Sequence, residues 1–209
     1  PLLIGGNDVA SVAIEPSMAN RHGLIAGATG TGKTITLQVL AQSFSQLGVP
    51  VLVPDIKGDF SGIAKAGKPG EKLQKRADKV GLGTMTLHGA PTVFWDVFGE
   101  HGHPLRLTIA ELGPVLLSRL LNLNETQSGI IGQGGERLFG EPAISLDDFL
   151  QTDEHGQGVV NVLHAAKLYQ DSPLAYSCIL LWLLSELFEQ LPEVGDADKP
   201  RFVLFFDEA

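Results

Sequence analysis

The 209-residue sequence has one cysteine, few basic residues and no long apolar run. The single cysteine, Cys178, excludes a disulfide framework and a zinc site built from cysteines, and it indicates a reducing compartment. The longest apolar run, 178–184, is far shorter than the ~18–20 residues of a membrane-spanning helix. The N-terminus has no signal-peptide pattern. We therefore expect a cytoplasmic protein that has no membrane partner.

Acidic residues outnumber basic ones by 24 to 15, which gives a net charge of −9. The excess lies in the second part of the chain, because residues 81–209 hold six Lys and Arg against eighteen Asp and Glu. Residues 1–80 hold nine against six. The overall acidity disfavours a protein that coats nucleic acid with its whole surface. The basic first part still allows a smaller contact with a polyanion.

Short apolar stretches alternate with helical patterns, which predicts an α/β fold with a mostly parallel sheet and helices on both faces. Strands are expected at 23–26, 49–53, 84–87, 92–97, 159–163 and 201–206. Helices are expected at 33–47, at 60–79 with a break at 67–70, at 109–123 and at 172–191. The last helix is apolar on nearly all sides, so we expect it to be buried. Ser145 and Asp148 have the spacing of a capping box.

Residues 27–34 match the phosphate-binding pattern G-x-x-x-x-G-K-[ST], with a predicted strand before them and a helix after them. Glycines let the backbone approach the phosphates, and the N–H groups at the start of the helix converge on them. Lysine adds a positive charge, and the hydroxyl of the last residue is a ligand for Mg²⁺. The predicted nucleotide-binding residues are Gly27, Ala28, Thr29, Gly30, Thr31, Gly32, Lys33 and Thr34.

Two acids follow the apolar strand predicted at 201–206. A strand that ends in solvated acids is common, but the phosphate-binding pattern elsewhere in the chain favours a metal and catalytic role. Asp207 would hold Mg²⁺ together with Thr34, and Glu208 would activate the attacking water. Glu208 and Lys33 are then the predicted catalytic residues. No N-K-x-D element for guanine recognition is present, so ATP is the expected nucleotide.

The chain resembles the HerA-like branch of the FtsK/HerA superfamily, and most closely the bacterial YjgR-like proteins, in residues 21–34, 53–60, 181–193 and 205–208. The segment 53–60 contains a D-x-K-G-D element, which is more discriminating than the phosphate loop. The resemblance implies a RecA-like ATPase core, a homo-oligomeric and typically hexameric ring, and ATP-driven movement of double-stranded DNA. The resemblance is also consistent with a partner nuclease.

We expect one RecA-like domain over 1–209, with a helical insertion at about 98–150. Residues 127–140 contain five glycines immediately after a predicted helix, and the chain ends directly after a predicted buried strand. Both features predict missing segments, one near 127–140 and one after 209. The resemblance implies that a γ-phosphate sensor and an arginine reaching the neighbouring subunit lie in the second missing segment.

Three further features have alternative interpretations. Asp55 and Lys57 follow a predicted strand, and they either organise metal and γ-phosphate or form a polar turn closed by Gly58. The basic segment 57–79 is either a DNA-facing surface or a solvated helix face; its basic residues are Lys57, Lys65, Lys68, Lys72, Lys75, Arg76 and Lys79. His101 and His103 lack a third ligand at usable spacing, so we interpret them as loop residues. Finally, the chain could bind ATP for regulation or assembly without moving DNA.

Overall fold

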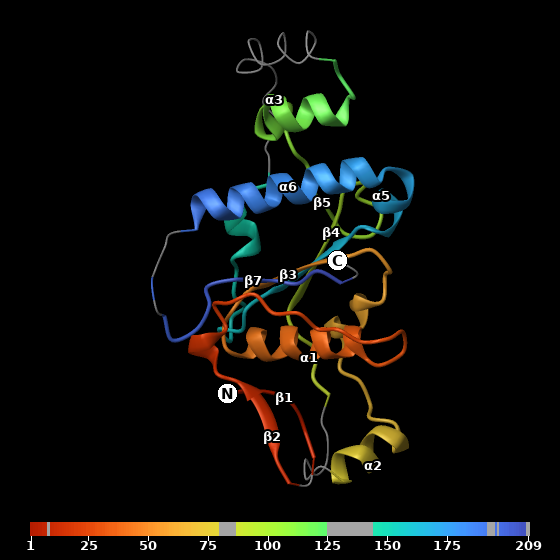
Figure 1. Ribbon diagram of the computed structural model, residues 1–209, viewed down its shortest axis with the longest axis vertical. Coiled ribbons are helices and arrows are strands. Elements are labelled where there is room, and N and C mark those ends of the chain that lie inside the picture. Colours follow the sequence, from red (N-terminus) through yellow and green to blue (C-terminus); the bar gives the residue numbers. More distant parts are fainter. Residues whose placement is uncertain (8, 80–86, 125–143, 192–194, 196, 208–209) are drawn as a thin grey trace.

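A computed structural model describes residues 1–7, 9–79, 87–124, 144–191, 195 and 197–207 (Figure 1). Its centre is a five-stranded sheet in the order β5-β4-β6-β3-β7, and every neighbouring pair is parallel. The strands are β3 (Val51–Asp55), β4 (Thr92–Asp96), β5 (His103–Pro104), β6 (Val160–His164) and β7 (Val203–Leu204). The parallel sheet confirms the predicted α/β class.

Helices cover both faces of the sheet, as predicted. Helix α1 (Lys33–Gln46) lies on one face and α6 (Pro173–Gln190) on the other (Figure 1). Successive side chains of a strand point to opposite faces. Val51 and Val53 of β3 therefore join the core around α1, while Leu52 between them joins the core around α6. All three side chains are fully buried.

The remaining helices are short or interrupted. They are α2 (Glu71–Lys79), α3 (Ile109–Leu120), α5 (Ala166–Asp171) and the 3₁₀ turns η1 (Pro16–Met18), η2 (Phe60–Ala64) and η4 (Leu146–Phe149). The predicted capping box at Ser145 and Asp148 is present at the start of η4. Helix α3 ends before the predicted residue 123, and Gly113, with φ of 66°, and Pro114 interrupt it.

Pro54 lies inside β3, although the sequence predicted that the strand ends there. The backbone N–H and C=O groups of even-numbered residues in β3 point toward β7, since the carbonyl of Leu52 accepts a hydrogen bond from the N–H of Phe205. The pairing of β3 with β7 covers only Val51 and Leu52. Pro54 therefore faces β7 beyond the paired residues, where its missing N–H removes no hydrogen bond of the sheet.

Two predicted strands are wrong in whole or in part. Residues 23–26 form no strand, and the Leu24 side chain is 91% exposed. The strand predicted at 201–206 is reduced to the two residues of β7, and Phe206 is exposed. Among the described residues, 23–26 pair with no strand, and β7 pairs with β3 over two residues only.

The N-terminal residues form a structure that we did not predict. Strands β1 (Leu2–Gly6) and β2 (Ser11–Ile14) make an antiparallel hairpin. Leu2 buries its side chain in the core around α1. The short strand β5 was also not predicted. Of the strand predicted at 84–87, residues 84–86 lie outside the described residues, and Leu87 is not in a strand.

The helix predicted at 172–191 is present as α6, but it is not buried on all sides. Trp182, Leu183 and Leu187 pack into the core, whereas Leu174, Leu181, Leu184 and Phe188 are exposed. One face of α6 thus covers the sheet and the opposite face is an apolar surface. Among the described residues, no helix is both long and apolar enough to cross a membrane.

Candidate nucleotide-binding site

Polar side chains gather at the carboxyl edge of the sheet. Asp96, His164 and Asp55 are the last residues of β4, β6 and β3, and Asp207 follows β7. Because these strands are parallel and adjacent in that order, the four residues form a row along one edge. Ligands of open α/β sheets bind at this edge.

The predicted phosphate loop lies at the start of α1. Gly30 and Gly32 have φ of 79° and 97°, which side chains rarely permit. Among the described residues, no side chain caps α1 after Gly32, so the first N–H groups of the helix are not used by a capping side chain. These N–H groups and the positive end of the helix dipole suit a phosphate.

The loop is closed by its own side chains. The Lys33 Nζ donates hydrogen bonds to the carbonyls of Gly27 (2.9 Å) and Ala28 (3.3 Å). The Thr31 hydroxyl donates to the same Ala28 carbonyl at 2.8 Å. A side chain at Gly27 would lie 2.5 Å from the Thr31 Oγ1, so this closed loop needs glycine there. Lys33 must leave these carbonyls to reach a phosphate.

Thr34 and Asp207 are in direct contact. The Thr34 Oγ1 donates a hydrogen bond of 2.9 Å to the Asp207 Oδ2. Helix α1 supplies the hydroxyl, and the segment that follows β7 supplies the carboxylate. The structure therefore brings together the two residues that the sequence predicted as Mg²⁺ ligands. Glu208, the predicted general base, lies outside the described residues.

Asp55 organises the turn that follows β3. Its side chain is 4% exposed, and its carboxylate accepts hydrogen bonds from the N–H groups of Lys57, Gly58 and Phe60. Gly58 has φ of 77°, as the turn requires. These contacts are those of the polar turn, which was one of the two interpretations of Asp55 and Lys57. The Lys57 side chain is at the exposed surface of this turn.

Asp59 is a site residue that the sequence reasoning missed. Desolvation raises the pKa of its carboxyl group, and the nearby carboxylates of Asp55 and Asp207 raise it further. Three acids thus lie within electrostatic range of one another beside Thr34. The signal was present in the sequence, since Asp59 is the final residue of the D-x-K-G-D element.

The row continues away from the phosphate loop. Burial disfavours the charge of Asp96, but the N–H groups of Phe98, His101 and Glu100 hold its pKa below the usual value, with help from His164. The rings of His101 and His164 meet edge to face at 5.0 Å. His103 packs on Trp95 instead. Within the described part of the chain, no group of three or more His, Cys, Asp or Glu residues is placed to hold a metal ion.

The donor set beside the loop suits Mg²⁺. This ion prefers oxygen ligands and keeps several waters, so one hydroxyl and one carboxylate are enough protein ligands when phosphates supply the rest. Thr34 and Asp207 offer these oxygens. The carboxylates of Asp55 and Asp59 add further negative charge near these oxygens, which a divalent cation would offset. The residues present therefore fit Mg²⁺.

The fold is that of an α/β domain with a parallel sheet flanked by helices, and the candidate site lies at the carboxyl edge of that sheet. The sequence matches the family described as Helicase HerA-like C-terminal over residues 2–133 and 130–209, and the chain belongs to this family. Its membership confirms the HerA resemblance, and it places the chain in an ATPase and helicase-type superfamily. No curated protein and no solved structure matches the chain.

Proposed function

We propose that this chain binds and hydrolyses ATP with Mg²⁺ as the motor domain of a DNA-translocating ring. The observation that supports ATP chemistry best is the hydrogen bond between Thr34 and Asp207, since it joins the phosphate loop to the acidic end of another strand. Family membership supports the motor, because relatives of this class are helicase-like. The hexameric ring, the double-stranded DNA and a partner nuclease remain parts of this proposal.

In this proposal, different groups of the site bind the phosphates, hold Mg²⁺ and accept the proton of the attacking water. The N–H groups of the loop and the start of α1 would bind the β- and γ-phosphates, and Lys33 would move from the Gly27 and Ala28 carbonyls to the same phosphates. Thr34 and Asp207 would hold Mg²⁺, which neutralises phosphate charge when bound. Glu208 would accept a proton from the water that attacks the γ-phosphate in line. Asp55 keeps its turn in place through backbone contacts.

A second function is favoured by the charge of the chain. The net charge of −9 leaves little surface for DNA, so the domain could instead use ATP to regulate or assemble other proteins. The basic residues of α2 favour the motor. Lys72 and Lys75 are exposed there, and the Lys75 Nζ lies 3.9 Å from the Glu71 carboxylate.

Steady-state ATP turnover separates these functions. The full-length protein is assayed with and without duplex DNA, beside the variants Lys33→Ala and Glu208→Gln. A motor requires turnover that rises with DNA and falls by about 10²-fold or more in both variants. ATP turnover that does not change when DNA is added, together with no DNA binding, contradicts the motor and favours the regulatory function. Turnover that survives both substitutions contradicts the site.

A further inference from the structure

His164 occupies the middle of the row of polar side chains at the carboxyl edge of the sheet. It is the half-buried last residue of β6, and β6 lies between β4 and β3. Side chains alternate along β6, since Val162 belongs to the core around α1 and Leu163 to the core around α6. The His164 side chain therefore points to the face of the sheet that α1 covers, where the predicted phosphate loop precedes the helix.

On one side, His164 supports the turn that follows β3. The Cα atoms of His164 and Asp55 are partners in the pairing of β6 with β3, and the N–H of Ala165 donates a 2.9 Å hydrogen bond to the Asp55 carbonyl. A side chain at Gly58 would begin 3.8 Å from the His164 Cε1, which is an ordinary van der Waals distance. The imidazole thus lies against the turn at Gly58, immediately before Asp59.

On the other side, His164 meets the loop that follows β4. Its ring and the ring of His101 meet edge to face, with their centroids 5.0 Å apart. The N–H of His101 donates a 2.9 Å hydrogen bond to the carboxylate of Asp96, which is buried. A side chain at Gly102 would clash with the Phe94 carbonyl, so the loop needs glycine there. His101 therefore supports His164 from a tightly packed loop.

The turn that His164 supports carries an acid of the candidate site. Desolvation raises the pKa of the Asp59 carboxyl group, and the charges of Asp55 and Asp207 raise it further, so Asp59 lies near the candidate metal ligand Asp207. The Asp59 carbonyl accepts a 3.1 Å hydrogen bond from the Gln38 Nε2 of α1. The turn is therefore held between helix α1 and the imidazole of His164. A shift of the turn would move Asp59 relative to Asp207.

We propose that His164 is a positioning residue of the nucleotide site. Its imidazole, supported by His101, holds the turn at Gly58 and so keeps Asp59 beside the Mg²⁺ position. This role rests on the proposed binding of Mg²⁺–ATP, and it requires no contact of His164 with the nucleotide or the ion. Protein interiors leave few voids, so a side chain much smaller than a ring would leave the turn unsupported on this side.

The enhancement of ATP binding by Mg²⁺ tests the positioning role. The dissociation constant of a fluorescent ATP analogue is measured for the full-length protein with and without Mg²⁺, and the ratio of the two constants is compared between variants. His164→Ala should reduce this ratio by about threefold or more, because Asp59 is no longer held in place. His164→Phe keeps a ring against Gly58 and should retain most of the ratio. A His164→Phe variant that behaves like His164→Ala overturns the proposal.

A double-mutant cycle tests the route through Asp59. In the background of Asp59→Asn, His164→Ala should cause no further loss of the ratio, since the acid that His164 positions is already absent. Independent losses from the two substitutions overturn this route. A ratio of one in the unmodified chain contradicts the proposed metal site and the positioning role together. A larger ratio that His164→Ala leaves unchanged overturns the positioning role alone.

Stability measurements separate positioning from a purely structural role. Thermal unfolding of His164→Ala and His164→Phe is followed without nucleotide. A structural role alone would lower the unfolding temperature of His164→Ala and leave its Mg²⁺ ratio equal to that of the unmodified chain, which would overturn the proposal. A reduced ratio in a His164→Ala chain that is still folded at the temperature of the titration supports it.

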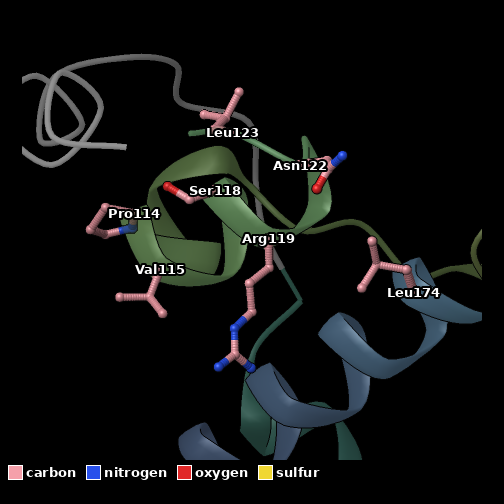
Figure 2. A pocket seen from close by; sticks show the side chains of 7 residues that line it. All are labelled: Pro114, Val115, Ser118, Arg119, Asn122, Leu123 and Leu174. Carbon is pink, nitrogen blue, oxygen red and sulfur yellow. The ribbon is translucent and has the colours of Figure 1, made fainter. Parts of the chain in front are cut away.

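Two controls come from positions away from the row. His155 is an exposed histidine in the turn before β6, at the opposite edge of the sheet. Val115 lines a groove of about 690 Å³ between α3 and α6 (Figure 2), and none of the described residues that line this groove belongs to the row. His155→Ala and Val115→Ala should keep the Mg²⁺ ratio of the unmodified chain. A loss in either control as large as that in His164→Ala overturns a specific role for His164.

Discussion

The hydroxyl of Thr34 and the carboxylate of Asp207 share a 2.9 Å hydrogen bond across 173 residues of sequence. The contact forms because α1 begins, and β7 ends, at the same edge of the parallel sheet. With Mg²⁺ and nucleotide bound, the same two oxygens would be the protein's share of the ion's ligands. The contact thus holds the two proposed ligands at one place.

Removing the Thr34 hydroxyl should weaken Mg²⁺–ATP binding. Thr34→Val keeps the shape of the side chain but loses the donor to Asp207 and the metal ligand. We therefore expect the affinity for Mg²⁺–ATP to fall by about tenfold or more. Thr34→Ser keeps the hydroxyl and is the matched control. The measurement is a titration of a fluorescent ATP analogue with and without Mg²⁺. Equal affinity for the two variants would contradict a metal role for Thr34.

Neutralising Asp59 should stabilise the free chain slightly at neutral pH. Its pKa is raised in the folded state, so folding disfavours the charged carboxylate, and that cost appears as the pH rises above the ordinary pKa. Asp59→Asn removes the cost, and we expect a gain of at most about 0.5 kcal/mol for this exposed group. Thermal unfolding at pH 7 and at about pH 3 measures it.

The gain in stability from Asp59→Asn should vanish at about pH 3, where the Asp59 carboxyl group is protonated in both the folded and the unfolded state. The same variant should bind Mg²⁺–ATP more weakly, because an acid beside the proposed metal ligands is lost. Lower stability at pH 7, or unchanged Mg²⁺ dependence, would show that Asp59 has another role. Asp78→Asn, on exposed α2, is the control for a carboxylate distant from the site.

Local patterns predicted the elements that carry their own signals. Helix α1 and the capping box at Ser145 were both predicted, because helical periodicity and capping chemistry act over a few residues. The parallel sheet followed from the alternation of strands and helices. The approach of Asp207 to Thr34 was predicted only by combining two motifs that are far apart in sequence.

Features that depend on distant partners were predicted poorly. Residues 23–26 are apolar enough for a buried strand, but a strand forms only where its backbone pairs with another strand, and these residues have no such pairing within the described part of the chain. The composition of α6 predicted full burial, yet burial depends on what lies outside the helix. Asp59 was missed because its importance comes from two carboxylates placed nearby by the fold.

The basic residues of α2 provide a test of DNA contact. Replacing Lys72, Lys75 and Arg76 with alanine should weaken duplex DNA binding and flatten its dependence on salt. Each lost phosphate contact lowers the log–log salt slope by about 0.9. Filter binding across a salt series measures the slope. An unchanged slope would remove α2 from the interface.

The buried amide of Asn161 should be the most sensitive polar position in the core. Asn161 is fully buried in β6, where its Oδ1 accepts a 2.9 Å hydrogen bond from the Trp95 Nε1 and its Nδ2 donates to the carbonyls of Phe149 and Val51. Asn161→Leu keeps the size of the side chain but removes the acceptor of the Trp95 Nε1 and the side-chain donor to the Phe149 carbonyl. We expect a loss of about 2–4 kcal/mol in the free energy of unfolding, measured with urea.

A double-mutant cycle separates the lost hydrogen bond from altered packing. Trp95→Phe removes the indole donor, so its cost should be smaller in the Asn161→Leu background, where that donor has already lost its acceptor. We expect a coupling free energy of about 1 kcal/mol between the two positions. Strictly additive costs would show that Asn161 stabilises the core through its shape and its contacts with the carbonyls alone.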